Sequence, residues 1–246
     1  MAQTTIVVPC YNEAERLLPA AFLDALSRFP TLHLRFVNDG STDRTSEVLR
    51  SLATGCDGRI SIQELNCNSG KAEAVRQGIV ASIDEGAAYV GYWDADLSTP
   101  LSELTAFIDM LECAPDLEVV FGSRVRLLGR DVQRSTLRHL SGRVFATAAS
   151  WTLGLAVYDT QCGAKLFRVS PGVRTAFAEP FLSRWIFDVE ILARLRSVWE
   201  RRGIEPASRV VELPLQTWIQ VDGSKLRPRD VAKAAIELTA IAIRYP

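Results

Sequence analysis

The sequence predicts an α/β fold, with a mostly parallel sheet flanked by helices on both faces. Short apolar and β-branched runs alternate with stretches of helical periodicity through the first half of the chain. Runs such as 6–8 and 117–121 are apolar at nearly every position, which is typical of strands buried on both sides. The length of 246 residues suits one large domain.

Each element follows from this alternation in chain order. The apolar runs predict five strands, at 4–9, 32–37, 58–63, 87–93 and 117–123. The stretches between them predict helices at 13–28, 43–53, 70–85 and 100–113. In the second half the pattern predicts a long helix through 129–153, a short strand at 164–167, a helix at 184–202, a β-rich segment at 210–221 and a last helix from 228.

Composition excludes several classes of protein. Lys and Arg number 28 against 29 Asp and Glu, so the net charge of −1 argues against general nucleic-acid binding. The five cysteines are scattered and form no C-x-x-C pair, which predicts neither disulfides nor a zinc site and favours a reducing cytosol. The N-terminal residues have no signal-peptide pattern, and the apolar run 144–158 is shorter than the roughly 20 residues of a spanning helix. We therefore expect a cytoplasmic protein, at most peripheral at a membrane face.

Polar residues gather directly after the predicted strands. In open parallel sheets, ligands bind at the carboxyl ends of the strands. The segments at these positions are 9–13, 38–41, 66–71, 94–96 and 122–124. Carboxylates and amides collected at one sheet edge are costly unless they are hydrated, paired or liganded, so the pattern predicts a binding site there.

Two carboxylates, Asp94 and Asp96, leave a buried strand one residue apart. A hard cation such as Mg²⁺ or Mn²⁺ would offset their repulsion and could bridge to substrate phosphates. The alternative is a solvated turn that caps the next helix.

Two further strand ends carry candidate ligand-binding groups. Asp39 could accept from a base N–H or a ribose hydroxyl, or it could belong to an ordinary β–α turn in which Gly40 supplies backbone freedom. Lys71, after Gly70 at a helix start, combines an ammonium with the helix dipole and suits an anion, or simply begins a surface helix. A P-loop is excluded because Leu65 stands where its first glycine is required.

A basic segment follows the fifth strand and contains one acid, Asp131. Its six arginines are Arg124, Arg126, Arg130, Arg134, Arg138 and Arg143. Several are four residues apart, which would align them on one helical face. The face is either solvated or docks to phosphate, pyrophosphate or anionic lipid headgroups.

Two later segments also carry chemistry. Asp188 and Glu190 begin an apolar helix, where the dipole favours acids, and Trp185 beside Asp188 could form a sugar platform. The loop with Ser224 and Lys225 is either a plain connection or a lid that brings a cation to donor phosphates.

Taken together, these segments resemble the family 2 glycosyltransferases of GT-A fold, in particular the dolichyl- and polyprenyl-phosphate glucosyltransferases. The motifs span about 90% of the chain in family order. They are VVPCYNEAERL (7–17), FVNDGSTDRT (36–45), NSGKAEAVRQG (68–78), DADLSTP (94–100), GSR (122–124), DTQCGAKLFR (159–168), RWIFDVEIL (184–192) and GSKL (223–226). The resemblance implies a Rossmann-like single domain over 1–246, with a nucleotide-binding half at about 1–125 and an acceptor half at about 126–246.

The resemblance also implies roles for individual residues. The set that would bind substrates is Pro9, Tyr11, Glu13, Asp39, Lys71, Gln161, Trp185 and Ser224. The set that would carry catalysis is Asp94, Asp96, Arg124, Asp188 and Lys225. Asp94 and Asp96 would hold Mg²⁺ or Mn²⁺ together with the sugar nucleotide, while Lys71 and Arg124 would face donor or acceptor phosphates.

The implied reaction is inverting transfer of a hexose, best matched by glucose from UDP-glucose, to a polyprenyl phosphate. A phosphate acceptor is already ionised, so Asp188 would orient it, whereas a soluble sugar acceptor would need Asp188 as base. The soluble acceptor and a catalytically silent nucleotide-sugar binding protein are the alternatives. The segment 144–158 and the last helix would contact a membrane surface, pack on the core or form a homodimer.

Overall fold

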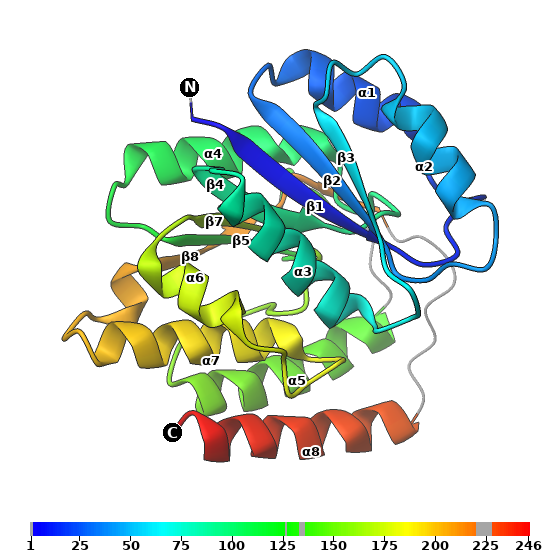
Figure 1. Ribbon diagram of the computed structural model, residues 1–246. Coiled ribbons are helices and arrows are strands. Elements are labelled where there is room, and N and C mark those ends of the chain that lie inside the picture. The colour runs from blue at the N-terminus through cyan, green and yellow to red at the C-terminus, as the bar shows by residue number, and fades with distance from the viewer. Residues whose placement is uncertain (1, 126, 133–135, 220–227) are drawn as a thin grey trace.

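A seven-stranded sheet forms the centre of the molecule (Figure 1). The computed structural model describes residues 2–125, 127–132, 136–219 and 228–246. Within the sheet the strand order is β3-β2-β1-β4-β7-β5-β8. The strands are β1 (Thr4–Cys10), β2 (Leu32–Asn38), β3 (Ile60–Glu64), β4 (Tyr89–Trp93), β5 (Val119–Ser123), β7 (Ala164–Arg168) and β8 (Val210–Pro214). All neighbours pair in parallel except β7, which runs antiparallel to both β4 and β5. The predicted α/β class and mostly parallel sheet are confirmed.

Helices cover both faces of this sheet. One face packs against α1 (Pro19–Arg28), α2 (Thr45–Ala53) and α4 (Leu104–Cys113). The other packs against α3 (Lys71–Asp84), α6 (Pro171–Ala178) and α7 (Phe187–Glu200), with α5 (Thr136–Leu153) and α8 (Pro228–Arg244) also joining this core. Along β1 the buried side chains alternate between the two cores, Val7 to the second and Ile6 and Val8 to the first, as strand geometry requires.

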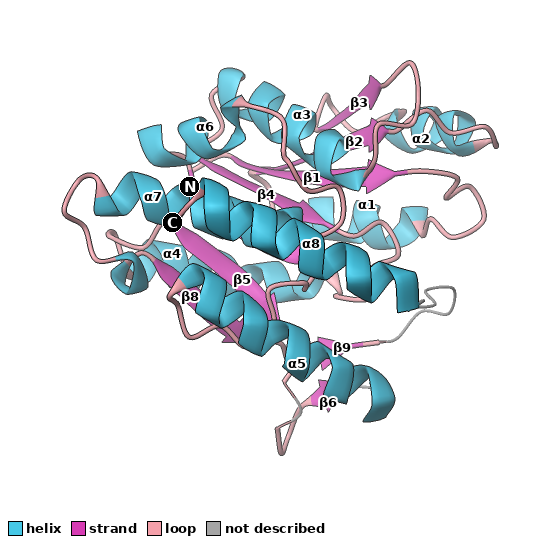
Figure 2. Cartoon of the chain, turned by 90° about the horizontal axis from the view of Figure 1, so that it is seen from below, coloured by secondary structure: helices cyan, strands magenta, loops and turns pink. Residues whose placement is uncertain are grey.

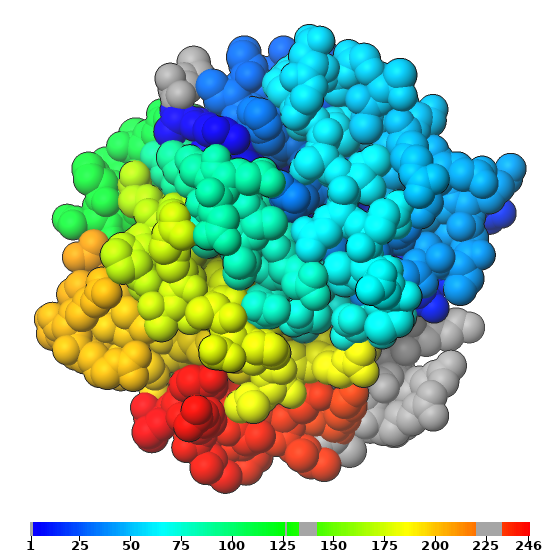
Figure 3. Space-filling model, in the orientation of Figure 1, coloured from blue at the N-terminus to red at the C-terminus, as the bar shows by residue number. Residues whose placement is uncertain are grey.

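The helices α5 and α8 lie side by side on the outside of the second layer (Figure 2). In the space-filling view α3 and α6 cover the middle of the visible face, and the red C-terminal helix follows its lower edge (Figure 3). Ala234, Leu238 and Ile241 of α8 are buried in the core, which confirms core packing for one face of this helix. No helix in the described parts of the chain is both long enough and apolar enough to cross a bilayer.

The predicted start of the long helix at residue 129 is wrong. Residues 131–132 instead form β6 (Asp131–Val132), which pairs with β9 (Thr217–Trp218) in a second, two-stranded sheet, and α5 begins only at Thr136. The backbone N–H of Asp131 donates to the carbonyl of Gln216 at 2.9 Å, a partner far away in sequence that helical periodicity cannot reveal.

The expected arginine stripe therefore does not form as one helical face. Arg124 follows β5 and Arg130 precedes β6, so neither lies on α5. Arg126 and Arg134 lie outside the described residues.

Helices α1 and α7 also begin later than expected. Pro19 starts α1, because the residues before it form a turn in which the backbone N–H of Arg16 donates to the carbonyl of Glu13. Phe187 starts α7, because the N–H of Ile186 donates to the side chain of Ser183 at 2.7 Å and closes a loop there. The prediction did not include α6, nor the short 3-10 helices η1 (Leu101–Glu103) and η2 (Pro206–Ser208).

The order of the strands creates a crevice between β1 and β4. The chain continues from β1 to β2 and β3 on one side, and then returns to place β4 on the other side of β1. Connections that leave neighbouring strands in opposite directions open a gap at the carboxyl ends of those strands. The segments that follow β1, β2 and β4 meet there.

Candidate active site

A cavity of about 370 Å³ opens at the carboxyl ends of β1, β2 and β4 and at the first turn of α3. Its lining is Pro9, Cys10, Tyr11, Glu13, Asp39, Asn68, Gly70, Lys71, Ala74, Asp94, Ala95 and Asp96. Every one of the four segments that supply these residues had been singled out as a strand end or helix start. The structure thus brings together Pro9, Tyr11, Glu13, Asp39, Lys71, Asp94 and Asp96.

Asp39 organises the loop on one side of this cavity. Its two carboxylate oxygens accept from the backbone N–H groups of Ser69, at 2.7 Å, and Gly70, at 2.8 Å. The following residue, Gly40, has φ +64°, and a Cβ there would lie 2.6 Å from the backbone nitrogen of Asn68. Glycine is required because the turn approaches the 67–70 backbone so closely. The carboxylate of Asp39 is buried and fixes the start of α3.

Lys71, the first residue of α3, pairs with Asp94 at the end of β4. Partial burial lowers the pKa of the Lys71 ammonium, but the carboxylates of Asp94 and Asp188 outweigh it and hold that pKa above its usual value. The ammonium therefore stays charged at neutral pH. An added cation at a helix N-terminus makes this corner of the cavity suited to phosphate oxygens.

Arg16, which the sequence analysis did not single out, lies beside the other carboxylates of the cavity. Its guanidinium is 3.5 Å from Oδ2 of Asp96 and 3.4 Å from Oε2 of Glu13. Burial raises the pKa of Glu13, Arg16 opposes the rise, and the nearby Asp96 and Asp94 add to it. The only sequence signal for Arg16 was its place inside the segment 7–17. Oδ1 of Asp96 accepts from the N–H of Ser98 at 3.0 Å, so the expected turn also forms.

Gly163, just before β7, touches the carboxylate of Asp94. A Cβ on this residue would lie 2.0 Å from Oδ2 of Asp94, and its carbonyl accepts from the N–H of Asp94 at 3.0 Å. Any larger residue would displace the carboxylate. The second half of the chain thus sets the position of a group that belongs to the first half.

Arg124 is bound by a carboxylate of its own chain. Its Nε and Nη2 donate to the two oxygens of Asp159 at 2.6 and 2.7 Å, and its backbone N–H donates to the same side chain at 3.1 Å. The guanidinium also lies over the ring of Trp218, 5.5 Å from its centre. Burial lowers the pKa of Arg124, yet the coulombic effect of Asp159 leaves it above its usual value. Among the described residues Arg124 does not line the cavity.

Asp188 lies in the first turn of α7, as predicted, but it is buried and does not line the cavity. Its side chain is 8% exposed and pairs with the ammonium of Lys165 at 2.5 Å, and the hydroxyl of Tyr92 donates to the same oxygen. Glu190, two residues further in the same first turn, accepts from the N–H groups of Leu182 and Ser183. Helix-start chemistry therefore accounts for Glu190.

The loop before α7 reaches back to the loop before α3, beside the cavity. Nη2 of Arg184 donates to the carbonyl of Ser69 at 2.6 Å, and the next residue, Trp185, is 45% exposed. Gln161 is partly buried in the segment that leads to Gly163. Ser224 and Lys225 lie outside the described residues.

The sequence profile of the family described as "Glycosyl transferase family 2" matches residues 5–171 of this chain. The chain belongs to glycosyl transferase family 2. As a member of this family it is a glycosyltransferase, and the resemblance inferred from the motifs is confirmed.

Curated relatives match this glycosyltransferase over nearly its whole length. A dolichyl-phosphate beta-glucosyltransferase of Trichomonas vaginalis is 34% identical, over 98% of this chain and 71% of the relative. Proteins of the same name from Dictyostelium discoideum and Homo sapiens are 31% and 32% identical, over 98% and 92% of this chain and 74% and 70% of their own lengths.

Solved structures agree with the fold. Glucosyl-3-phosphoglycerate synthase from Mycobacterium tuberculosis, in complex with Mn²⁺, uridine-diphosphate and glucosyl-3-phosphoglycerate, superposes with a TM-score of 0.67 at 17% identity, covering 99% of this chain and 80% of that one. The same enzyme with Mn²⁺ and uridine-diphosphate-glucose gives a TM-score of 0.68 at 14% identity, over 99% and 79%. The GT-A fold expected for this glycosyltransferase is thereby confirmed.

The residues of the glycosyltransferase site suit a divalent cation whose remaining ligands come from a substrate and water. In the parts of the chain that the structure describes, no group of three or more ligating side chains gathers. Asp94 and Asp96 instead offer two hard oxygen donors whose side chains are 34% and 23% exposed. Mg²⁺ is commonly bound in this way, by one or two carboxylates plus substrate phosphates and water. The chemistry of the donor set therefore fits the metal that the sequence predicts.

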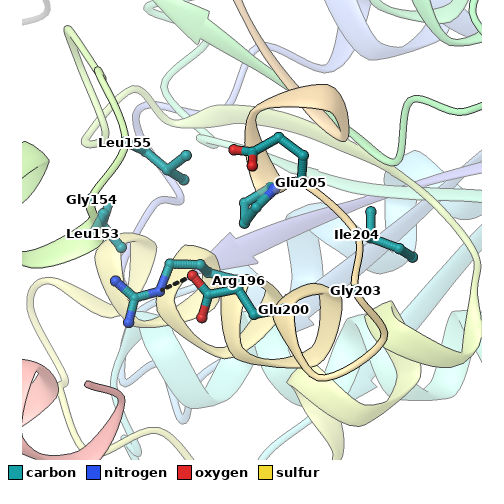
Figure 4. A pocket seen from close by; sticks show the side chains of 9 residues that line it. Leu153, Gly154, Leu155, Arg196, Glu200, Gly203, Ile204 and Glu205 are labelled. Carbon is teal, nitrogen blue, oxygen red and sulfur yellow. Dashed lines mark ion pairs between the residues drawn. The ribbon is translucent and has the colours of Figure 1, made fainter.

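A second cavity of this glycosyltransferase, of about 380 Å³, lies between the ends of α5 and α7 and contains none of the predicted site residues (Figure 4). Arg196 contributes a positive charge to the lining of this cavity. Its Nε is 3.5 Å from Oε1 of Glu200, and its guanidinium donates to the carbonyls of Thr152 and Tyr245. These groups compensate the arginine internally. The slightly larger cavity therefore offers a ligand no unbalanced charge from Arg196.

Proposed function

We propose that the chain transfers glucose from UDP-glucose to a polyprenyl phosphate, with inversion and with the help of a divalent metal. The observation that carries the proposal is the cavity at the β1–β4 crevice, lined by seven of the residues predicted for donor and metal binding. The names of the relatives support glucose as the sugar and a polyprenyl phosphate as the acceptor.

On the donor side, Pro9, Tyr11 and Glu13 would hold the nucleoside together with Asp39. Tyr11 is 45% exposed, so its ring is available to stack on a base. Asp39 already accepts from the 69–70 backbone, which favours a role in shaping the nucleoside pocket.

Asp94 and Asp96 would hold the metal, Mg²⁺ or Mn²⁺. When bound, the metal neutralises charge that develops on the departing diphosphate. Lys71 supplies a fixed positive charge to the same oxygens from the N-terminus of α3.

The acceptor chemistry needs no strong base. An oxygen of the acceptor phosphate forms a bond to the anomeric carbon while the bond from that carbon to the diphosphate oxygen breaks, so the electron pair leaves with the nucleoside diphosphate. Because the attacking phosphate is already ionised near neutral pH, no proton has to be removed. The burial of Asp188 and its pairing with Lys165 are consistent with an orienting group rather than a base.

The outer face of α5 and α8 supports contact with a lipid surface. Val144 and Trp151 are exposed seven residues apart on α5, as are Ile236 and Ile243 on α8. A spacing of seven places two side chains on the same face of a helix. Arg244 adds positive charge at the end of α8, while Lys233 pairs with Glu237. Such a face, apolar and basic, can lie in an anionic headgroup layer at the cytoplasmic side of a membrane.

The enzymatic test uses radiolabelled UDP-glucose, detergent-solubilised polyprenyl phosphate and Mg²⁺ or Mn²⁺. We expect label to move into an organic-extractable product, and chelation of the metal to abolish the transfer. Label that remains in the aqueous phase on a new sugar product would favour the soluble acceptor. Donor binding without transfer or hydrolysis would favour a silent binding protein.

The membrane test uses flotation with vesicles that contain anionic lipid. We expect the wild type to float and a Trp151→Ser/Ile243→Ser variant to float several-fold less, at unchanged thermal stability because both side chains are exposed. Wild-type protein that stays at the bottom of the gradient and sediments as a dimer would instead assign this face to a homodimer.

A further inference from the structure

We propose that Lys165 is a positioning residue of the active site. Its ammonium holds the carboxylates of Asp94 and Asp188 in the positions that sugar transfer requires. The inference rests on the proposed function. It is carried by one buried ammonium that donates to two carbonyls of the 160–162 segment and to Asp188 at the start of α7.

The ammonium of Lys165 has an acceptor for each of its N–H groups. The residue is 1% exposed, and its Nζ donates to the carbonyls of Thr160, at 2.8 Å, and Cys162, at 2.7 Å, and to Oδ1 of Asp188, at 2.5 Å. An ammonium has three N–H donors, so each is used. The rings of Tyr92 and Phe121 lie 5.2 and 5.9 Å away and enclose the remaining surface of the cation.

The first connection leads to the metal-binding carboxylate. The two carbonyls bound by Lys165 belong to the segment directly before Gly163, the residue that touches the carboxylate of Asp94 and accepts from its N–H. The strands are in register beside it, with Trp93 opposite Ala164 and Tyr92 opposite Lys165. Movement of the 160–163 segment would therefore move Asp94.

The second connection leads to α7. Asp188 accepts from both Lys165 and Tyr92, which joins the start of α7 to β7 and β4. Asp94 directly follows β4, so the same ammonium ties the start of α7 to the strand that carries this carboxylate.

Stability alone does not account for such a pair. The cost of removing two charges from water offsets much of their attraction, so apolar replacements of a buried pair are often neutral or better. Precise placement of reacting groups, by contrast, strongly affects catalysis, since a displacement of about 1 Å can cost about 100-fold in rate.

The test compares Lys165→Met with a matched control on the same strand, Arg168→Met. Arg168 lies three residues further along β7, opposite Tyr89, where it donates to the carbonyl of Leu117 at 3.0 Å and to the Tyr89 hydroxyl at 3.2 Å. Both changes remove a partly or fully buried cation beside a tyrosine, but only Lys165 is at the end of β7 that borders the cavity. Both proteins are assayed at a temperature where circular dichroism shows them folded.

We expect kcat of Lys165→Met to fall about 100-fold, while the Kd for the nucleoside diphosphate without metal changes less than about twofold. This split follows because the groups that would bind the nucleoside lie on β1 and β2, away from Lys165. Arg168→Met should keep kcat within about twofold of the wild type even if its melting temperature falls.

Two results would overturn the inference: an unchanged kcat in Lys165→Met, or equal losses of kcat in both variants, which indicate a structural role only. If Lys165→Met does not fold, Lys165→Arg replaces it, and a wild-type kcat in that variant would also overturn the inference, because the longer, forked guanidinium cannot reproduce the three bonds. If the wild type itself transfers no glucose to polyprenyl phosphate, it is the proposed function that fails.

Discussion

The carboxylates on the two sides of the active site differ in exposure and in the burial of their cationic partners. On the side proposed to bind the donor, Asp94 and Asp96 are 34% and 23% exposed, and their cationic neighbours Lys71 and Arg16 are 42% and 45% exposed at the side chain. On the side proposed to bind the acceptor, Asp159 and Asp188 are 6% and 8% exposed and pair with Arg124 and Lys165 in the interior. The donor side leaves its charges accessible to a ligand, whereas the acceptor side uses its charges to hold the framework.

This difference has a direct physical consequence. An exposed carboxylate can exchange its internal cation for a metal or a substrate at modest cost, because water screens each partner. A buried carboxylate cannot lose its partner without leaving an unpaired charge in the interior. Substitutions on the donor side should therefore reduce activity, and those on the acceptor side should first reduce stability.

The largest effect on folding is expected for Asp159→Ala, which leaves the guanidinium of Arg124 without its bidentate partner. Breaking a buried pair costs about 3–5 kcal/mol, measured here as the free energy of unfolding in urea. Asp24→Ala is the control, since Asp24 pairs with Arg28 at 2.8 Å but both side chains are more than half exposed; such pairs contribute about 1 kcal/mol or less. Equal losses in the two variants would refute the contrast.

Asp96→Asn should separate activity from folding on the donor side. The amide oxygen can still accept from the N–H of Ser98, so the fold is retained, but the negative charge is lost. We expect turnover to fall at least about 100-fold, equivalent to about 3 kcal/mol, with little change in melting temperature. Near-normal rates at saturating Mn²⁺ would show that the metal assignment is wrong.

A smaller effect is expected for Ser170→Ala, at the amino-terminal end of α6 away from the cavity. The Ser170 hydroxyl accepts from the N–H of Val173 at 3.1 Å and donates to Glu118. Loss of such a cap costs about 1 kcal/mol, which chemical denaturation resolves. Turnover per folded molecule should not change, and a drop in kcat would show that the framework and the site are coupled more widely than proposed.

The smallest effect concerns pH and Glu212, which accepts from the N–H groups of Tyr158 and Asp159. Burial raises the pKa of Glu212 above its usual 4.5, although these hydrogen bonds oppose the rise. Because the folded pKa lies above the unfolded one, the contribution of this group to stability is fully present below about pH 4.5 and is lost as pH rises through the folded value. Urea unfolding of the wild type and Glu212→Gln between about pH 4 and pH 7 should show the wild type losing stability relative to the variant. An opposite slope would contradict the raised pKa.

Local sequence patterns located the parts of the site that lie at strand ends. The apolar runs located β1, β2 and β4 to within a few residues, and Glu13, Asp39 and Asp94 follow them directly. In a parallel sheet these ends must meet at one edge, so the cavity could be predicted without coordinates. The start of α3 at Lys71 was equally local, because a glycine with freedom at positive φ precedes it.

Pairings between distant segments could not be predicted in this way. Nothing in its own segment indicated that Arg124 binds Asp159, 35 residues away. Lys165 stood inside a recognised motif without a role, and its partner Asp188 comes from helix α7, 23 residues further along the chain. The periodicity of residues 129–153 suggested one helix because nothing local indicates that Asp131 pairs with the strand at Thr217.

The sequence by itself therefore determined the α/β class, the family and the strand-end residues that line the cavity, since apolar periodicity and strand-end motifs are properties of short segments. Only the tertiary structure decided the antiparallel entry of β7 between β4 and β5, the contact of Gly163 with Asp94, and the identity of each buried ion pair. The reason is that a buried charge requires a partner but its own segment does not specify which one. That choice depends on which side chains the packed sheet and helices bring within hydrogen-bond distance.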